Sequence, residues 1–241
     1  MRIAVLSDIH GNLEAFEAVM ADISKQQCDR IICLGDVVGY GPDPGECIRI
    51  LADARIPCIK GNHDQACSSD EFPYRMNSIA QAAILWTQES LTRAEKLWLS
   101  NLPYTIEQDQ ITFVHATPYA PDEWDYVTAL WEAENAFDNF RGNICFIGHT
   151  HEPVAWTQEG QNIEAEKFDR LHIEHGKRYL INVGSVGQPR DRDPLSAYVL
   201  YDSDKGYFDL KRIAYDMAKT QEKILAAGLP MPLAQRLEIG R

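Results

Sequence analysis

The sequence predicts an α/β fold with a parallel sheet in its N-terminal part. Short apolar runs alternate with stretches of helical periodicity, which is the pattern of strand–helix–strand units. Each apolar run ends in polar residues, as buried strands do, and the last third of the chain is mostly strand-like. No Pro/Gly/Ser-rich linker divides residues 1–241, so we expect a single domain.

The first 64 residues show this alternation most clearly. Three apolar runs predict buried strands: residues 3–6, 31–34 and 56–59. Asn12 is placed to cap a helix whose apolar stripe begins at Leu13 and Phe16. Asp43, as a capping aspartate, and Pro44, at the first helical position, predict the start of a second helix.

Residues 66–103 have a different character, which we interpret as a helical insertion beside the site. Apolar positions from Met76 to Leu91 follow helical spacing, and Thr92 with Glu95 forms a capping box for a shorter helix. Further strands are predicted near residues 111–114, 144–147, 179–183, 197–201 and 207–213. The tail, residues 214–241, is expected to be helical up to Ala227, where Gly228 and two prolines stop it.

Composition excludes several classes of partner. The net charge of −13 argues against general electrostatic binding to duplex nucleic acid or an anionic membrane, although a small phosphorylated substrate needs only a local basic pocket. Six cysteines without a C-x-x-C pair favour reduced thiols. The N-terminus is too short for a signal sequence and no apolar stretch reaches membrane-spanning length, so a cytoplasmic protein is expected.

Four short motifs carry most of the chemical information. They are Asp8-Ile9-His10, Gly35-Asp36, Gly61-Asn62-His63-Asp64 and Gly148-His149-Thr150-His151, with His115 between the last two. Each follows a predicted strand, and ligands of open α/β sheets bind at the carboxyl ends of strands. We therefore expect these side chains to converge in space.

Carboxylates and imidazoles together favour transition metals. Aspartate oxygens offset the repulsion between two cations, and histidine nitrogens favour Mn, Fe, Zn, Ni or Co over Ca or Mg. Two such ions can share a carboxylate and a hydroxide that attacks phosphorus in line, while a remaining histidine protonates the leaving oxygen. The sequence thus predicts a dinuclear metal-dependent phosphoester hydrolase, with manganese as the first choice.

These residues resemble the calcineurin-like metallophosphoesterase superfamily over Met1 to about Arg190. Two segments are similar to its small bacterial and archaeal branch of the YfcE type: residues 35–42 (GDVVGYGP) and residues 182–190 (NVGSVGQPR). The resemblance implies a four-layer α/β/β/α sandwich of two mixed β-sheets flanked by helices. It also implies residue roles: Asp8, His10 and His151 bind one metal; Asn62, His115 and His149 bind the other; Asp36 bridges them; and His63, oriented by Asp64, is the general acid.

Several positions keep two interpretations. Asn12 either caps a helix or reaches a substrate phosphate, and Asn62 is a second candidate for substrate contact. Arg190 either pairs with a neighbouring aspartate or holds a phosphate oxygen. Tyr40 packs or lines the pocket, while Tyr74 and Arg75 are candidates for substrate contact from the insertion. Four tryptophans are expected to be core or packing residues rather than a stacking platform: Trp86, Trp98, Trp124 and Trp131.

Alternative functions also remain. A nuclease of the same superfamily would need a basic groove, and a non-catalytic scaffold stabilised by metal would not need His63. A protein phosphatase would need room for a phosphopeptide. The sequence leaves open the substrate, the preference for monoesters or diesters, and the oligomeric state, a homodimer included.

Overall fold

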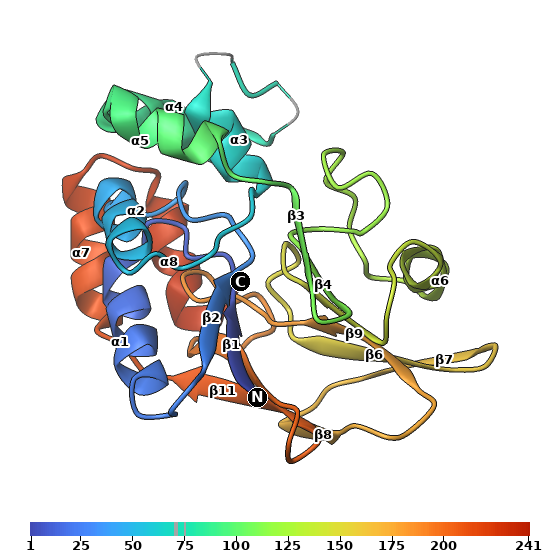
Figure 1. Ribbon diagram of the computed structural model, residues 1–241. Helices are drawn as coiled ribbons and strands as arrows, with labels where there is room; N and C mark the ends of the chain where they lie inside the picture. Colours follow the sequence, from blue (N-terminus) through green and yellow to red (C-terminus); the bar gives the residue numbers. More distant parts are fainter. Residues whose placement is uncertain (70–71, 75) are drawn as a thin grey trace.

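The computed structural model describes residues 1–69, 72–74 and 76–241. Two mixed β-sheets pack face to face at its centre, with helices on both outer faces (Figure 1). One sheet has the order β2-β1-β10-β11-β8 and the other β3-β4-β5-β9-β6-β7. The predicted four-layer sandwich is therefore confirmed.

The elements follow one another along the chain in this order. The N-terminal half contains β1 (Arg2–Leu6), α1 (Leu13–Ile23), β2 (Arg30–Cys33), α2 (Pro44–Asp53), α3 (Asn62–Ser68), α4 (Ser78–Ser90), α5 (Arg93–Ser100), β3 (Thr105–Gln108) and β4 (Ile111–Val114). The C-terminal half contains α6 (Leu130–Asp138), β5 (Ile144–Ile147), β6 (Val154–Glu159), β7 (Asn162–Glu166), β8 (Arg170–His172), β9 (Arg178–Asn182), β10 (Ser196–Asp202), β11 (Tyr207–Ile213), α7 (Met217–Ala226) and α8 (Met231–Ile239).

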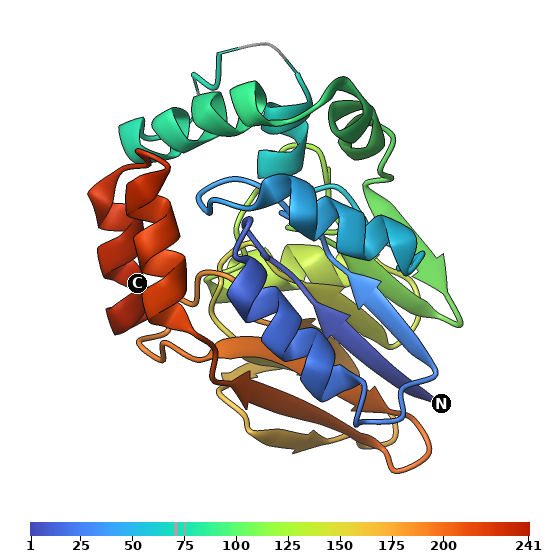
Figure 2. The same cartoon turned by 90° about the vertical axis from the view of Figure 1, so that its left-hand side faces the viewer.

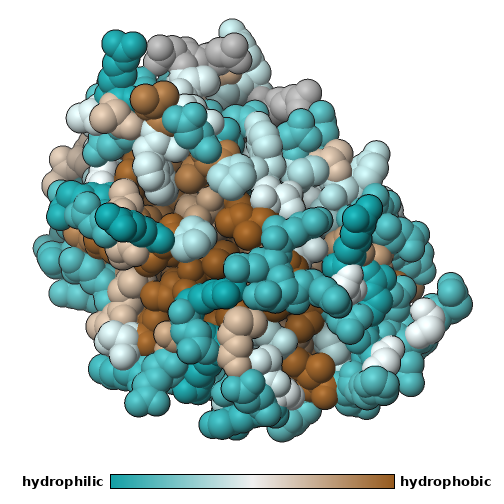
Figure 3. Space-filling model, viewed as in Figure 1, coloured by the Kyte–Doolittle hydropathy of each residue, from teal (hydrophilic) through white to brown (hydrophobic). Residues whose placement is uncertain are grey.

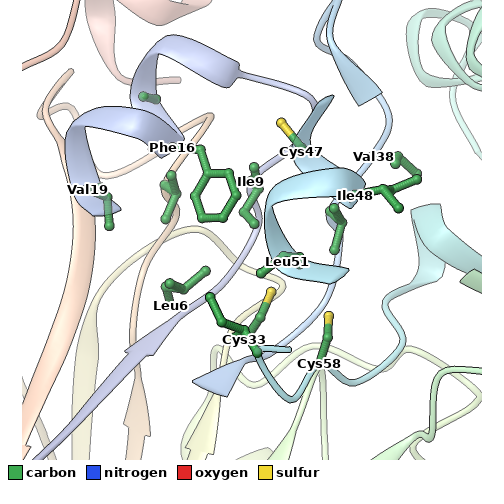
Figure 4. Packing of buried hydrophobic residues seen from close by; sticks show 14 of the residues in the cluster. Leu6, Ile9, Phe16, Val19, Cys33, Val38, Cys47, Ile48, Leu51 and Cys58 are labelled. Carbon is green, nitrogen blue, oxygen red and sulfur yellow. The ribbon is translucent and has the colours of Figure 1, made fainter. Parts of the chain in front are cut away.

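Apolar side chains fill the three spaces between the four layers. Between the sheets, Val5 and Ile32 pack with Phe113 and Phe146. Leu6 and Cys33, on the other face of their strands, pack beneath α1 and α2 with Phe16 and others (Figure 4). On the far side, α6 covers β4 and β5. Alternate residues of β1 and β2 thus serve two cores, as the period of a strand requires.

Two groups of helices lie outside the two sheets: α3, α4 and α5, and the tail helices α7 and α8 (Figure 2). Ala80 and Ala83 of α4 share one apolar cluster with Leu233 and Leu237 of α8, and Tyr40 belongs to the same cluster. The predicted helical segment and the C-terminal tail therefore pack on each other next to one of the site motifs.

Two local predictions were wrong. Residues 56–59 form only an isolated bridge from Cys58 to Cys33, because Lys60 N–H turns away to donate to the Pro103 carbonyl. Asp43 precedes α2 without capping it, since its carboxylate pairs with Lys223 of α7. The predicted stop at Gly228 is confirmed, since α7 ends at Ala226, and a second tail helix, α8, begins after it with Pro232 in its first turn.

The surface is mainly polar on the face shown in Figure 3, with apolar side chains gathered toward its centre and left. Trp131 is 67% exposed, so its predicted place in the core is wrong. No helix within residues 1–69, 72–74 and 76–241 is long and apolar enough to span a membrane.

Candidate metal centre

The polar motifs lie where the sequence analysis expects them, at the carboxyl ends of neighbouring strands. Asp8 follows β1, Asp36 follows β2, His115 follows β4 and His149 follows β5. The strands of each pair, β1 with β2 and β4 with β5, run parallel, so their carboxyl ends share one edge of the sandwich. The two sheets therefore supply the two sides of one site.

The loops of the site have an unusual backbone. Six non-glycine residues have positive φ between 50° and 65°: Asp8, His10, Asp36, Tyr40, His149 and His151. Such residues cost about 1 kcal/mol or more each, so neighbouring structure must hold them. Asp8 N–H donates to the Gly35 carbonyl at 3.0 Å and His10 N–H donates to the Asp36 carbonyl at 2.9 Å. The two loops thus fix each other's backbone, as a preorganised site requires.

Two glycines allow the close packing of this centre. A Cβ on Gly61 would lie 2.0 Å from Oδ1 of Asp36, and one on Gly39 would lie 2.4 Å from Nδ1 of His63. Gly39 also has a φ of +84°, which disfavours any other residue. The glycines quoted in the motifs therefore make room for the functional side chains.

His10 and His151 form one side of the centre. Nδ1 of His10 lies 3.0 Å from the Val38 carbonyl, and Nδ1 of His151 lies 2.6 Å from the Gln188 carbonyl. Each Nδ1–H can donate to its carbonyl, which leaves both Nε2 atoms without a proton in the neutral rings. Those Nε2 atoms face each other at 3.1 Å, and Oδ1 of Asp8 lies 3.2 Å from that of His151.

His115 and His149 repeat the arrangement on the other side. Nδ1 of His115 lies 2.8 Å from the Leu34 carbonyl, and Nε2 of His149 lies 3.0 Å from the Trp124 carbonyl. Their remaining ring nitrogens are 3.2 Å apart. Metal-binding histidines commonly turn one nitrogen to a carbonyl in this way, which fixes the tautomer and the ring.

Asp36 lies between the two histidine pairs. Its Oδ2 is 3.4 Å from Nε2 of His115 and 3.7 Å from Nε2 of His10, while Oδ1 accepts from the backbone N–H of His63. Asp36 consequently belongs to two of the three potential metal-binding groups of the described residues: Asp8/His10/His151, His10/Asp36/His63 and Asp36/His115/His149.

The protonation equilibria reflect this crowding of buried charge. Burial alone would lower the pKa of His115, but Asp36 and then Asp8 raise it to about 10. Burial lowers the pKa of His149 to about 3, and the charge on His115 adds to that effect. Burial opposes ionisation of Asp36, yet His115 and His63 hold the pKa of its carboxyl well below the usual range. The carboxylates thus attract a cation to the centre.

The donor set fits divalent metal ions. Facing lone pairs on His10 and His151 repel each other unless a cation lies near both. Asp8 Oδ1 and Asn62 Oδ1 are buried polar atoms that hydrogen-bond to no described residue. Unsatisfied buried oxygens are costly, and a metal ion at each would satisfy them. Nitrogen and oxygen donors in this mixture suit Mn, Fe, Zn, Ni or Co.

His63 lies against the centre, but Asp64 does not orient its ring. The His63 ring centroid is 4.4 Å from that of Tyr40 and 4.8 Å from that of His10. Asp64 accepts from the backbone N–H groups of Val37 and Val38 through Oδ1 and from Gly61 through Oδ2. Both carboxylate oxygens are thus occupied with backbone, and Nδ1 of His63 has no hydrogen-bond partner among the described residues. Packing by Tyr40 replaces the expected hydrogen bond.

Asn12 is not available to a substrate, so the interpretation of Asn12 as a contact to a substrate phosphate is wrong. Its side chain is 2% exposed. The amide oxygen accepts from the backbone N–H of Ala15, as a helix cap, and from Oγ1 of Thr220. The amide nitrogen donates to the Gly187 carbonyl. Asn12 therefore joins α1, the tail and the loop after β9.

A cavity of about 750 Å³ opens from the centre. Asp36, Asn62, His63, His149, His151 and Arg190 line its inner part. The rest of the lining includes Gln65, Ala66, Ser69, Asn77, Ala80, Asp122 and Glu123, together with a mainly aromatic set that we call the outer wall: Phe72, Pro73, Tyr74, Met76, Trp124 and Tyr126. Tyr74, a predicted candidate for substrate contact, thus lines the cavity. Arg75, the other candidate from the insertion, lies outside the described residues. Trp124 was expected to be a core or packing residue and instead lines the cavity.

Tyr126 and Gln188 are functional candidates that sequence reasoning missed. The Tyr126 ring stacks on His149 with centroids 4.2 Å apart. Gln188 contributes its carbonyl to His151 and its side-chain oxygen to Arg190. The loop with Tyr126 has no periodic pattern, whereas Gln188 stands inside a quoted motif and directly before Pro189 and Arg190. Only Gln188 could therefore have been identified as a candidate from the sequence.

Comparison with known proteins agrees with this geometry. Residues 1–206 match the family model of the calcineurin-like phosphoesterase superfamily domain. The chain is a calcineurin-like phosphoesterase. The crystal structure of a metallophosphoesterase from Sphaerobacter thermophilus is similar over 100% of both chains, with 36% identity and a TM-score of 0.88.

Two curated relatives show the breadth of the family. Uncharacterized protein MJ0912 of Methanocaldococcus jannaschii is 37% identical over 99% of this chain and 98% of its own length. Phosphodiesterase YfcE of Escherichia coli K12 is 22% identical over 85% of this chain and 89% of its own. The similarity to YfcE supports the predicted branch of the family.

Proposed function

We propose that the chain hydrolyses small phosphoesters with two divalent metal ions bound by the buried cluster. Asp8, His10 and His151 would hold one ion, Asn62, His115 and His149 the other, and Asp36 both. One observation carries the proposal. Four histidines each turn one nitrogen to a backbone carbonyl and the other toward a buried aspartate, in two facing pairs.

When bound, divalent ions would supply positive charge for the phosphoryl oxygens and lower the pKa of a water molecule, with manganese as our first choice. The chain's own residues would then do the rest. Carbonyls of Val38, Leu34 and Gln188 keep the imidazoles in place. Arg190, on the cavity wall, would bind a phosphate oxygen.

His63 would donate a proton to the leaving oxygen. Burial lowers the pKa of its imidazole to about 4, and neighbouring Arg190 opposes protonation as well. A dianionic phosphate arriving beside the ring raises that pKa, because the negative charge favours the imidazolium. The proton would thus be available when substrate is present, which couples acid catalysis to binding.

Small substrates suit the cavity better than macromolecules do. A volume of about 750 Å³ is in the range of pockets for small ligands. The outer wall lines the same cavity, and the net charge of −13 does not favour a nucleic acid duplex. We propose one catalytic domain over the whole chain and a cytoplasmic location in keeping with the thiols expected to be reduced, and we leave the oligomeric state open, a homodimer included.

The first test is hydrolysis of p-nitrophenyl phosphate and bis-p-nitrophenyl phosphate by protein that is chelated and then reloaded with manganese. Metal-dependent cleavage of either supports the proposal, and the faster of the two assigns monoester or diester preference. Full activity of chelated protein would contradict it. Two bound ions without any cleavage would favour the scaffold alternative, and nicking of plasmid DNA the nuclease.

A further inference from the structure

The C-terminal helix α8 brings an arginine to the candidate metal centre. Arg236 donates from Nη1 to Oε1 of Gln188 at 3.3 Å, and Arg190 donates from Nη2 to the same oxygen at 2.9 Å. The backbone carbonyl of Gln188 lies 2.6 Å from Nδ1 of His151. Two arginines that are far apart in the sequence thus contact Gln188, the residue whose carbonyl lies beside the proposed metal ligand His151.

Tyr40 separates this arginine pair from the proposed general acid. The guanidinium carbons of Arg190 and Arg236 lie 5.8 Å and 5.9 Å from the centroid of the Tyr40 ring. The same ring lies 4.4 Å from the ring of His63 and 4.7 Å from that of His10. The Tyr40 ring therefore lies between the two guanidiniums and the metal centre. Arg190 also lines the cavity.

Both guanidiniums donate to a neutral amide oxygen rather than to a carboxylate. No carboxylate in the described part of the chain forms an ion pair with Arg190 or Arg236. Arg170 and Arg212, by contrast, each pair with an aspartate. Burial lowers the pKa of Arg236, and the like charge of Arg190 lowers it further. In a chain with a net charge of −13, two adjacent guanidiniums that share only the neutral Gln188 Oε1 keep their full charge for a bound anion.

We propose that Arg190 and Arg236 form a second anion subsite, which holds the phosphate next to the reacting one. Preferred substrates would then carry two linked phosphates, as in a phosphoanhydride. Guanidinium groups bind phosphate with paired hydrogen bonds, and two of them around one phosphate give both affinity and orientation. The inference rests on the proposed function and gives the C-terminal tail a part in substrate selection.

The experiment measures how well AMP and ADP inhibit p-nitrophenyl phosphate hydrolysis by manganese-loaded protein. For Arg236→Gln we expect the inhibition constant of ADP to rise at least about tenfold, and that of AMP to change less than about twofold. Arg236→Lys, which keeps the charge without the planar fork, should give an intermediate value for ADP. The matched control is Arg241→Gln, which removes an exposed arginine five positions away and should leave both constants unchanged.

Equal losses for AMP and ADP would overturn the subsite, because they indicate one shared phosphate position or a positioning role for Arg236. Calorimetric binding of inorganic pyrophosphate and orthophosphate to chelated protein gives a readout independent of activity. Tighter binding of pyrophosphate that Arg236→Gln abolishes supports the subsite even if no substrate is cleaved, in which case only the proposed function fails. Identical pyrophosphate binding by both proteins overturns the subsite and leaves the proposed function intact.

Discussion

The buried metal centre and the outer wall of the cavity differ in almost every physical property. The centre consists of aspartate and histidine side chains with almost no exposure, held by backbone carbonyls and by residues at positive φ. The outer wall is aromatic and partly exposed: Phe72 is 42%, Tyr126 49% and Tyr74 84% exposed. The first region is rigid and made for one chemistry, whereas the second can change without disturbing it. Substrate preference should therefore depend on the outer wall and the rate of the chemical step on the centre.

Asp36→Asn should have the largest effect on the centre. Loss of the charge shared by both proposed metal sites removes transition-state stabilisation, so turnover of p-nitrophenyl phosphate should fall about 10³-fold or more. Metal content, measured by mass spectrometry after dialysis, should fall with it. Asp209→Asn is the matched control, since that buried aspartate pairs with Arg170 and Lys211 elsewhere. Retained activity in Asp36→Asn would refute the proposed role of Asp36.

His63→Gln should separate proton donation from metal binding. We expect turnover to fall about 10²- to 10⁴-fold, as for loss of a general acid. Metal content should stay unchanged, because the three potential ligand groups keep all other members. His172→Gln, on β8, is the control and should behave as the parent protein. Loss of metal together with activity would reassign His63 from acid to ligand.

Chelation should destabilise the folded protein by a moderate amount. Ligand binding to the native state adds about 2.7 kcal/mol when the ion is at 100 times its dissociation constant. For a chain of this size that corresponds to a loss of roughly 5–10 °C in Tm on chelation, measured by calorimetry. Asp36→Asn should show a much smaller shift. Equal shifts in both proteins would mean that the stabilising ion binds elsewhere.

Tyr126→Ala should have the smallest effect and sharpen the comparison. Removing a stacked ring from the outer wall costs about 0.5–1.5 kcal/mol, so KM should change less than about tenfold. Turnover and metal content should persist, because His149 keeps its Trp124 carbonyl contact. Tyr119→Ala is the control, as Tyr119 is 48% exposed and outside the cavity lining. A collapse of turnover would place the outer wall within the chemical machinery.

The sequence predicted which aspartates and histidines converge, because they stand in short motifs at strand ends. Asp8 and Asp36 each follow an apolar run, and parallel strands bring such positions to one edge. Adjacency in sequence was a poorer guide to contact. Asp64 follows His63 directly, yet its carboxylate accepts from the backbone N–H groups of Val37 and Gly61 and not from the His63 ring.

Other features could not be predicted because they depend on partners far along the chain. Asn12 meets Thr220, which lies 208 residues later, and Asp43 meets Lys223. Pro232 is compatible both with the end of a helix and with the first turn of a new one. In each case the local pattern allowed two outcomes, and tertiary contacts selected one.

The strand order has a consequence for synthesis of the chain. β1 lies between β2 and β10, so one edge of the first strand stays unpaired until Ser196–Asp202 has left the ribosome. At 5–20 residues per second that interval lasts roughly 10–40 s, and exposed strand edges are prone to misassociation. The nascent N-terminal segment is thus a natural client for chaperones, and ribosome-bound chains that stop before Ser196 should be far more sensitive to protease than the released protein.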